Sequence, residues 1–323
     1  MRAGRETRRA GERDHGGVVG AERGPWEEGL DAQGGRRRAH AGAEPAVCRH
    51  PARDHEALAA VGLRPRKRWG QHFLCDPAVA RRSVDTAELG PRSVVLEIGP
   101  GLGALTDELV ARAGRVYLIE IDPGLATRLA AQHAGNPRVR VVEGDVLTLP
   151  LAETVREPSA TVVANLPYNI ATPVLFRLLD LRARLPRAVI MLQREMAARL
   201  AAGAGSADYG VTSVLVQAFA EVRLAFGVSR RSFLPRPEVD SAVVDIRWSA
   251  GARADVGDVD LFREVVRAAF GQRRKMLRNA LAALAARRGV AAEAALVRAA
   301  VAPTARAETL DLAAFARLAR ALA

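Results

Sequence analysis

Short runs of β-branched residues alternate with amphipathic stretches between residues 92 and 193, and this alternation restricts the possible fold more than any other feature. Parallel sheets with helices on both faces have this pattern. The strand-like runs are SVVLEIG, RVYLIEID, RVRVVEGD, ATVVANL and RAVIMLQ. The runs GVTSVLVQAFA (210–220) and SAVVDIRW (241–248) predict two further strands. From about residue 260 the pattern becomes helical, because AFGQRRKMLRNALAALAARRG has apolar residues at helical spacing opposite a basic face.

These patterns predict three parts of the chain. Residues 1–60 are rich in Gly, Arg, Ala and Glu without a sustained period, which is typical of a disordered basic extension or of a wrongly assigned start codon. Residues 61–252 contain the predicted sheet, and residues 253–323 are predicted to form a small helical domain.

The composition predicts a cytoplasmic protein. No uncharged apolar run approaches the roughly eighteen residues that a membrane span needs. The two cysteines, Cys48 and Cys75, are fewer than a disulfide framework uses, which predicts a reducing, cytosolic setting. The charged first residues are not followed by the apolar core of a secretory signal, so we expect no export.

The positive charge is concentrated in two regions. The net charge is +12, and residues 260–323 carry 12 Arg and Lys against 5 Asp and Glu. Residues 51–70 carry 5 basic residues against 2 acidic ones. A genome rich in Arg codons would explain the preference for Arg over Lys, but not the clustering. The clustering favours a polyanionic partner such as nucleic acid.

A glycine-rich turn follows the first predicted strand. In VVLEIGPGLGALT, Gly99, Gly101 and Gly103 lie between a buried strand and a helix, where glycine permits tight turning and close approach of a ligand to main-chain N–H groups. Glu120 ends the next strand, at the position where an acid binds ribose hydroxyls. These features fit NAD as well as another adenosine-containing cofactor.

Polar residues also follow the next two strands. Asp145 ends RVRVVEGD, and a carboxylate there is able to accept a hydrogen bond from an adenine amino group. The following strand ends in Asn-Leu-Pro-Tyr at residues 165–168. All of these groups would lie at the carboxyl edge of the sheet, which is where open α/β sheets bind ligands.

This order of motifs resembles the S-adenosylmethionine-dependent methyltransferases, and Asn-Leu-Pro-Tyr resembles the motif of those that methylate an exocyclic amine. Seven segments together are similar to the ribosomal RNA adenine dimethyltransferase family of the KsgA type, from Arg66 into the C-terminal region. They are RKRWGQHFLCD, EIGPGLGALT, NLPYNIATPVLF, MLQREMAARL, YGVTSVLVQAF, FLPRPEVDSAVV and AFGQRRKMLRNAL.

The resemblance implies a Rossmann-like class I methyltransferase sheet of seven mostly parallel strands at residues 61–252, followed by a small helical RNA-binding domain. It implies dimethylation of N6 of two adjacent adenosines near the 3′ end of small-subunit (16S) rRNA in an assembling ribosomal particle. The implied cofactor is S-adenosylmethionine. We expect a monomer with no metal site and no membrane association.

The resemblance also assigns roles to individual residues. The cofactor-binding positions are His72, Leu74, Gly99, Gly101, Glu120, Asp145 and Asn165. The catalytic positions are Asn165, Leu166, Pro167, Tyr168 and Phe233. The RNA-binding positions are Arg273, Arg274, Lys275 and Arg278, on a basic helix that would bind phosphates. His72 is a departure, because the family usually has Asn there.

The chemistry of an adenine amine explains these residue types. The Asn165 oxygen and a main-chain carbonyl in the Leu166–Pro167 segment would accept the two N–H groups and direct the nitrogen lone pair at the methyl group. The base must leave its stack to enter the pocket. Tyr168 would offer the first stacking face and Phe233 the second.

Three alternative functions remain open at this stage. A methyltransferase of the antibiotic-resistance type would act on large-subunit rRNA, but those enzymes usually carry Lys where this chain has Leu102. A non-catalytic assembly or transcription factor would have no need of Asn165, Pro167 and Tyr168. An NAD enzyme would have no use for the Asn-Leu-Pro-Tyr segment.

Overall fold

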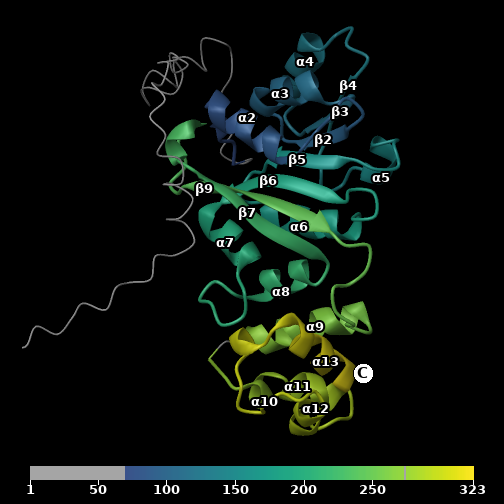
Figure 1. The fold of residues 1–323 in the computed structure, drawn as a ribbon, viewed down its shortest axis with the longest axis vertical. Helices are drawn as coiled ribbons and strands as arrows, with labels where there is room; N and C mark the ends of the chain where they lie inside the picture. The colour runs from purple at the N-terminus through teal and green to yellow at the C-terminus, as the bar shows by residue number, and fades with distance from the viewer. Residues whose placement is uncertain (1–69, 273) are drawn as a thin grey trace, which may run out of the picture. The chain divides into compact units, whose positions relative to one another are not determined.

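The computed structural model describes residues 70–272 and 274–323 (Figure 1). The predicted extension at residues 1–60 and the RNA-binding position Arg273 lie outside the described residues, as does Cys48. Among the described helices, none has the length and apolar character needed to cross a membrane.

A sheet of seven strands dominates the first part of the described chain, and this confirms the predicted fold class. The strand order is β4-β3-β2-β5-β6-β9-β7, with β2 to β6 parallel and β9 antiparallel to both β6 and β7. The strands are β2 (Val94–Ile98), β3 (Arg115–Glu120), β4 (Val139–Glu143), β5 (Thr161–Asn165), β6 (Arg187–Gln193), β7 (Ala220–Val228) and β9 (Ser241–Trp248).

Helices α3 to α6 connect the parallel strands, α2 precedes β2 and α7 follows β6. They are α2 (Pro77–Thr86), α3 (Ala104–Arg112), α4 (Pro123–Gln132), α5 (Leu151–Thr154), α6 (Ala171–Asp180) and α7 (Arg194–Ala201). Local sequence explains two of their starts, because Asp76 and Asp122 accept main-chain hydrogen bonds as N-caps before a proline in the first turn. The β-branched runs form the buried strands, and Val95, Val162 and Val163 have no exposed surface.

A second, two-stranded sheet joins distant parts of the chain. Strand β1 (Phe73–Leu74) pairs antiparallel with β8 (Phe233–Leu234), which follows the short 3-10 helix η3 (Arg230–Ser232). Residues 70–74 are thereby held beside the loop between β7 and β9. Cys75, at the end of this segment, is disulfide-bonded, which differs from the reduced cysteines expected from the sequence.

The prediction of a strand at residues 210–220 is wrong. Residues Val211–Gln217 form helix α8, and the strand β7 begins only at Ala220. The Gly210 N–H donates to Ser213 Oγ at the start of the helix, and Ser213 Oγ donates to the carbonyl of Arg199 in α7. These contacts stabilise a helix in a β-branched run whose composition suggests a strand.

The C-terminal part is helical, as predicted. Figure 1 shows these helices, coloured green to yellow, grouped together. They are α9 (Val259–Gly271), α10 (Leu277–Ala280), α11 (Ala282–Arg287), α12 (Ala292–Arg298), the 3-10 helix η4 (Ala307–Thr309) and α13 (Leu312–Ala321). Phe262 and Phe315 have no exposed surface, and Phe270 stacks on Phe315 at 5.7 Å. The division at residue 252 stays a prediction.

The basic helix expected from the sequence is not formed at residues 274–276. Helix α9 ends at Gly271, and Arg274 and Lys275 lie in the turn before α10. The Leu277 N–H donates to the carbonyl of Ala305, and the Arg278 N–H donates to the carbonyl of Pro303. The segment 303–305 therefore satisfies main-chain groups at the start of a new helix.

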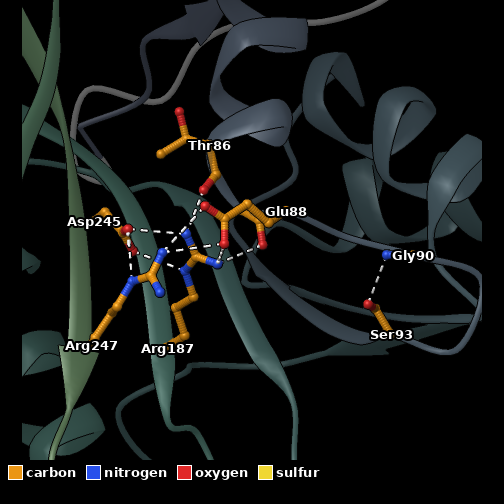
Figure 2. Close-up of polar contacts among 8 residues, drawn as sticks. Thr86, Glu88, Gly90, Ser93, Arg187, Asp245 and Arg247 are labelled. Carbon is orange, nitrogen blue, oxygen red and sulfur yellow. Dashed lines mark hydrogen bonds and ion pairs between the residues drawn. The ribbon is translucent and has the colours of Figure 1, made fainter.

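A polar network surrounds Arg187, the first residue of β6 (Figure 2). Its guanidinium donates to both oxygens of Asp245, at 2.9 and 3.0 Å, and to Glu88 Oε2 at 2.8 Å. It also donates to the carbonyls of Thr86 and Ala87, at the end of α2. Arg247 donates to Asp245 Oδ2 at 3.2 Å and to both carboxylate oxygens of Glu88, at 3.3 and 3.2 Å. The network joins α2 to the sheet at the edge opposite the carboxyl ends of the parallel strands.

Candidate active site

One pocket lies at the carboxyl edge of β2, β3, β4 and β5. It is lined by residues at or just after the carboxyl ends of these four strands and by the segment at residues 70–74. Ten of the predicted cofactor-binding and catalytic residues line it, namely His72, Leu74, Gly99, Gly101, Glu120, Asp145, Asn165, Leu166, Pro167 and Tyr168. The parallel topology explains this grouping, because the carboxyl ends of parallel strands meet at one edge.

The glycine turn after β2 forms one wall of the pocket. Gly101 has a φ of +57°, and a Cβ added to it would lie 2.9 Å from Cδ1 of Phe73. Phe73 is 7% exposed and packs with Leu125 and Leu234. A side chain at position 101 would thus clash with the segment that covers the turn, so glycine is required for both backbone shape and space.

Glu120 lies beside this turn at the end of β3. Its Oε2 accepts a hydrogen bond from the Gly101 N–H and its Oε1 accepts one from the Asp122 N–H, both at 3.0 Å. Burial raises the pKa of the Glu120 carboxyl, whereas these main-chain hydrogen bonds lower it. Each oxygen retains lone-pair capacity for a further donor, such as a ribose hydroxyl.

Asp145 is held in a turn after β4. Its Oδ1 accepts a hydrogen bond from the Leu147 N–H at 2.8 Å, and its carbonyl accepts from the N–H groups of Thr148 and Leu149. One carboxylate oxygen therefore fixes the loop. The side chain is half-buried in the pocket wall, and Oδ2, which accepts no hydrogen bond from the described residues, has the capacity to accept one from an amino group.

The Asn165 side chain has a defined orientation at the end of β5. Its Nδ2 donates to the main-chain carbonyl of His72 at 3.0 Å. A carbonyl oxygen is only an acceptor, so this bond identifies which end of the amide is nitrogen. Within residues 70–272 and 274–323, Oδ1 accepts no hydrogen bond. The acceptor end of the amide is thus available to the pocket.

The two neighbouring carbonyls differ in their partners. Pro167 O accepts the N–H of Ile170 at 3.1 Å, whereas Leu166 O accepts no hydrogen bond from the part of the chain that the structure describes. Leu166 is 1% exposed as a residue, and its N–H donates to the carbonyl of Met191 at 3.3 Å. The geometry therefore favours Leu166 over Pro167 as the main-chain acceptor beside Asn165.

Tyr168 is fixed at both its hydroxyl and its ring. Its hydroxyl and Ser241 Oγ are 2.8 Å apart, and its ring stacks on the imidazole of His72 with centroids 5.6 Å apart and planes at 28°. Burial raises the pKa of the Tyr168 phenol, so the hydroxyl stays protonated near neutral pH.

Phe233 does not offer the second aromatic face expected from the sequence. Its ring is 3% exposed, it packs in the main hydrophobic core, and it is not among the residues that line the pocket. Pairing with Leu74 in the small β1–β8 sheet turns this position into the core. We correct the expectation accordingly.

Sequence reasoning missed Glu97. This residue lies in β2, is 1% exposed, lines the pocket and accepts a hydrogen bond from Thr106 Oγ1 at 2.7 Å. Burial raises its pKa to about 8, with a further contribution from the nearby Glu120. The available signal was a single acid inside the apolar run VVLEI, next to the glycine turn.

The predicted RNA-binding residues lie apart from the pocket lining. Arg274, Lys275 and Arg278 are exposed, and the guanidinium of Arg278 lies 3.6 Å from the carboxylate of Glu293. Their role in binding RNA remains a prediction.

Comparison with known proteins identifies the family of this chain. The model of the family described as ribosomal RNA adenine dimethylase matches residues 62–323. A ribosomal RNA small subunit methyltransferase A from Moorella thermoacetica is 44% identical over 281 residues, which is 84% of this chain and 97% of that protein. The protein of the same name from Streptomyces coelicolor is 47% identical over 274 residues, 83% of this chain and 95% of its own length.

Solved structures agree with this relationship. A dimethyladenosine transferase from Plasmodium falciparum has a TM-score of 0.67 and 26% identity, covering 76% of this chain and 96% of its own. The 23S rRNA methyltransferase ErmE has a TM-score of 0.59 and 31% identity, covering 77% of this chain and 99% of its own. The chain therefore belongs to the ribosomal RNA adenine dimethylase family, whose members are S-adenosylmethionine-dependent methyltransferases.

Proposed function

We propose that this enzyme transfers methyl groups from S-adenosylmethionine to N6 of two adjacent adenosines near the 3′ end of small-subunit (16S) rRNA during ribosome biogenesis. The orientation of the Asn165 amide carries the proposal, because its donor end is bound to His72 O and its acceptor end is left to the pocket. The names of the relatives, at 42–47% identity, support the small subunit as the source of the RNA.

The pocket residues fit an adenosine-containing cofactor. Glu120 would accept hydrogen bonds from the ribose hydroxyls, and Oδ2 of Asp145 would accept one from the adenine amine. Gly99 and Gly101 would allow close approach of the main chain, while His72 and Leu74 would close the pocket from the N-terminal segment. When bound, S-adenosylmethionine supplies an electrophilic methyl group on a sulfonium centre.

Asn165 and Leu166 would prepare the substrate nitrogen. An adenine amine is a weak nucleophile because its lone pair is delocalised into the ring. Acceptance of its two N–H groups by Asn165 Oδ1 and Leu166 O would favour a pyramidal nitrogen with its lone pair directed at the methyl group. Pro167 has a fixed φ and no N–H to compete with the substrate. Alignment of nitrogen and carbon then supplies most of the rate enhancement, without a strong base.

Tyr168 would stack on the extruded adenine. Extrusion costs a few kcal/mol, and stacking on an aromatic ring returns about 1–3 kcal/mol. The hydroxyl contact with Ser241 fixes the ring of Tyr168 before the base arrives, which reduces the entropy lost on binding.

The exposed basic residues before and within α10 would bind the phosphates of the rRNA. Arg274 and Lys275 lie in a turn rather than in a helix. Their side chains would therefore contact an RNA sugar-phosphate backbone that passes the start of α10. We further propose that the enzyme acts as a monomer in the cytoplasm, on an assembling ribosomal particle.

One structural observation supports the alternative function of a large-subunit rRNA methyltransferase, namely the similarity to ErmE. The identity of 31% is nevertheless lower than the 44% and 47% shared with the two small-subunit enzymes described above. The two functions are separated by expressing this protein in cells that lack their own rRNA adenine dimethyltransferase. Primer extension then maps the methylated adenosines on the small-subunit and large-subunit rRNAs of these cells. Methylated adenosines on the large-subunit RNA alone would contradict our proposal.

The direct test is transfer of labelled methyl groups from S-adenosylmethionine to unmodified small-subunit particles. Asn165→Ala should retain particle binding but lose at least about a hundredfold in kcat, because the nitrogen loses an aligning acceptor. Asn136→Ala is the matched control, since Asn136 is a partly exposed amide whose Oδ1 accepts the N–H of Arg138 in a turn outside the pocket lining. Unchanged turnover of Asn165→Ala would remove this residue from the mechanism.

A further inference from the structure

The side chain of His72 has contacts that binding of a cofactor does not explain. Its imidazole stacks on Tyr168, and its Nδ1 lies 2.7 Å from the carbonyl oxygen of Pro235. Because a carbonyl only accepts, Nδ1 is the donor and carries the proton. The main-chain oxygen of the same residue accepts the Asn165 amide. One residue thus contacts the two side chains that would hold the substrate base.

The anchor of His72 is itself well fixed. Pro235 follows strand β8, which pairs with β1, so the two ends of the Nδ1–O hydrogen bond belong to paired segments. The bond therefore holds the imidazole plane against rotation about the side-chain torsions, and the ring presents a constant face to Tyr168.

The stacking distance limits where a base is able to bind. Two stacked rings with centroids 5.6 Å apart do not leave space for a third ring between them, because each aromatic contact needs centroids at least about 4.5 Å apart. One face of Tyr168 is therefore covered by His72, and an incoming adenine has the other face. Since Phe233 is buried in the core, His72 is the aromatic neighbour that Tyr168 has in place of the expected Phe233.

We propose that the imidazole of His72 is a positioning residue for the base site, which braces the ring of Tyr168 from behind so that its open face meets the extruded adenine. The main-chain oxygen of the same residue orients Asn165, so one segment sets both the stacking surface and the hydrogen-bond acceptor. This role rests on the proposed function, in that it concerns the binding of the adenine substrate.

Substitution of the ring separates this role from cofactor binding. His72→Ala keeps the main-chain oxygen that holds Asn165 but removes the brace, whereas His72→Phe keeps a ring and loses only the bond to Pro235. Methyl transfer to unmodified small-subunit particles gives kcat and KM, and calorimetry gives the Kd for S-adenosylmethionine. Thermal unfolding of each variant controls for stability.

The expected result is a fall in kcat of between about two- and tenfold for His72→Ala, which is the contribution of one aromatic pair. The Kd for S-adenosylmethionine should remain within twofold of the wild-type value, and His72→Phe should recover most of the lost rate. Any of three results would overturn the proposal. The first is an unchanged kcat in His72→Ala, and the second is a rise in the Kd for S-adenosylmethionine that matches the loss of rate. The third is a His72→Phe variant as slow as His72→Ala. Absence of turnover by the wild-type enzyme would instead contradict the proposed function, which keeps the two failures distinct.

Discussion

Replacement of Arg187 by Met should destabilise the protein strongly, although the residue lies far along β6 from the pocket. The substitution keeps most of the apolar stem but removes both hydrogen bonds to Asp245 and those to the carbonyls of Thr86 and Ala87. The Asp245 side chain is only 7% exposed, and it would retain a single contact with Arg247 at 3.2 Å. A nearly buried carboxylate would be left poorly paired.

The size of the effect follows from these contacts. Breaking a buried ion pair by removing one partner costs about 3–5 kcal/mol. The remaining contact with Arg247 offsets part of that loss, and the exposed Glu88 adds little, since solvent screens its charge. We expect Arg187→Met to lower the free energy of unfolding by about 2–4 kcal/mol.

Urea denaturation at fixed pH measures this change, because the midpoint shifts with stability while the slope reports the surface exposed on unfolding. Arg247→Met is the matched control: its side chain is 43% exposed, and it should cost less than about 1 kcal/mol. The double variant Arg187→Met with Asp245→Leu should recover part of the stability, because no charge is then left unpaired. Equal destabilisation by Arg187→Met and Arg247→Met would refute the reasoning.

Two further predictions concern the pocket and the RNA. Burial raises the pKa of Glu97 to about 8 from an ordinary value of 4.5, so the folded protein holds a proton that the unfolded chain releases, and stability should fall as the pH rises from about 4.5 to 8. The Glu97→Gln variant keeps an acceptor for Thr106, and at pH 8 its free energy of unfolding should exceed that of the wild type by up to roughly 5 kcal/mol. Urea denaturation at several pH values measures this difference. The same change in the free energy of unfolding with pH in both proteins would contradict the prediction. Substitution of Arg274 and Lys275 by Ala should reduce the slope of log K against log salt concentration for particle binding by the equivalent of about one to two phosphate contacts. The control variant Arg92→Ala, at the edge of the sheet opposite the pocket, should leave this slope unchanged.

The sequence alone determined the sheet and most of the pocket for a local reason. Buried parallel strands require apolar β-branched runs, and their carboxyl ends meet at one edge whatever the details of packing. Gly101, Glu120 and Asp145 could therefore be assigned from position along the chain. The same local reasoning failed at residues 211–217, because a buried helix and a buried strand have similar apolar composition.

Only the tertiary structure decided which groups face the substrate. The break in the basic helix depends on main-chain bonds from Leu277 and Arg278 to the segment 303–305. The burial of Phe233 depends on pairing with Leu74, and the orientation of the Asn165 amide depends on the carbonyl of His72. These partners lie between 25 and 159 residues apart in the sequence. Periodicity and composition describe near neighbours, so they do not contain such contacts; only the folded chain brings them together.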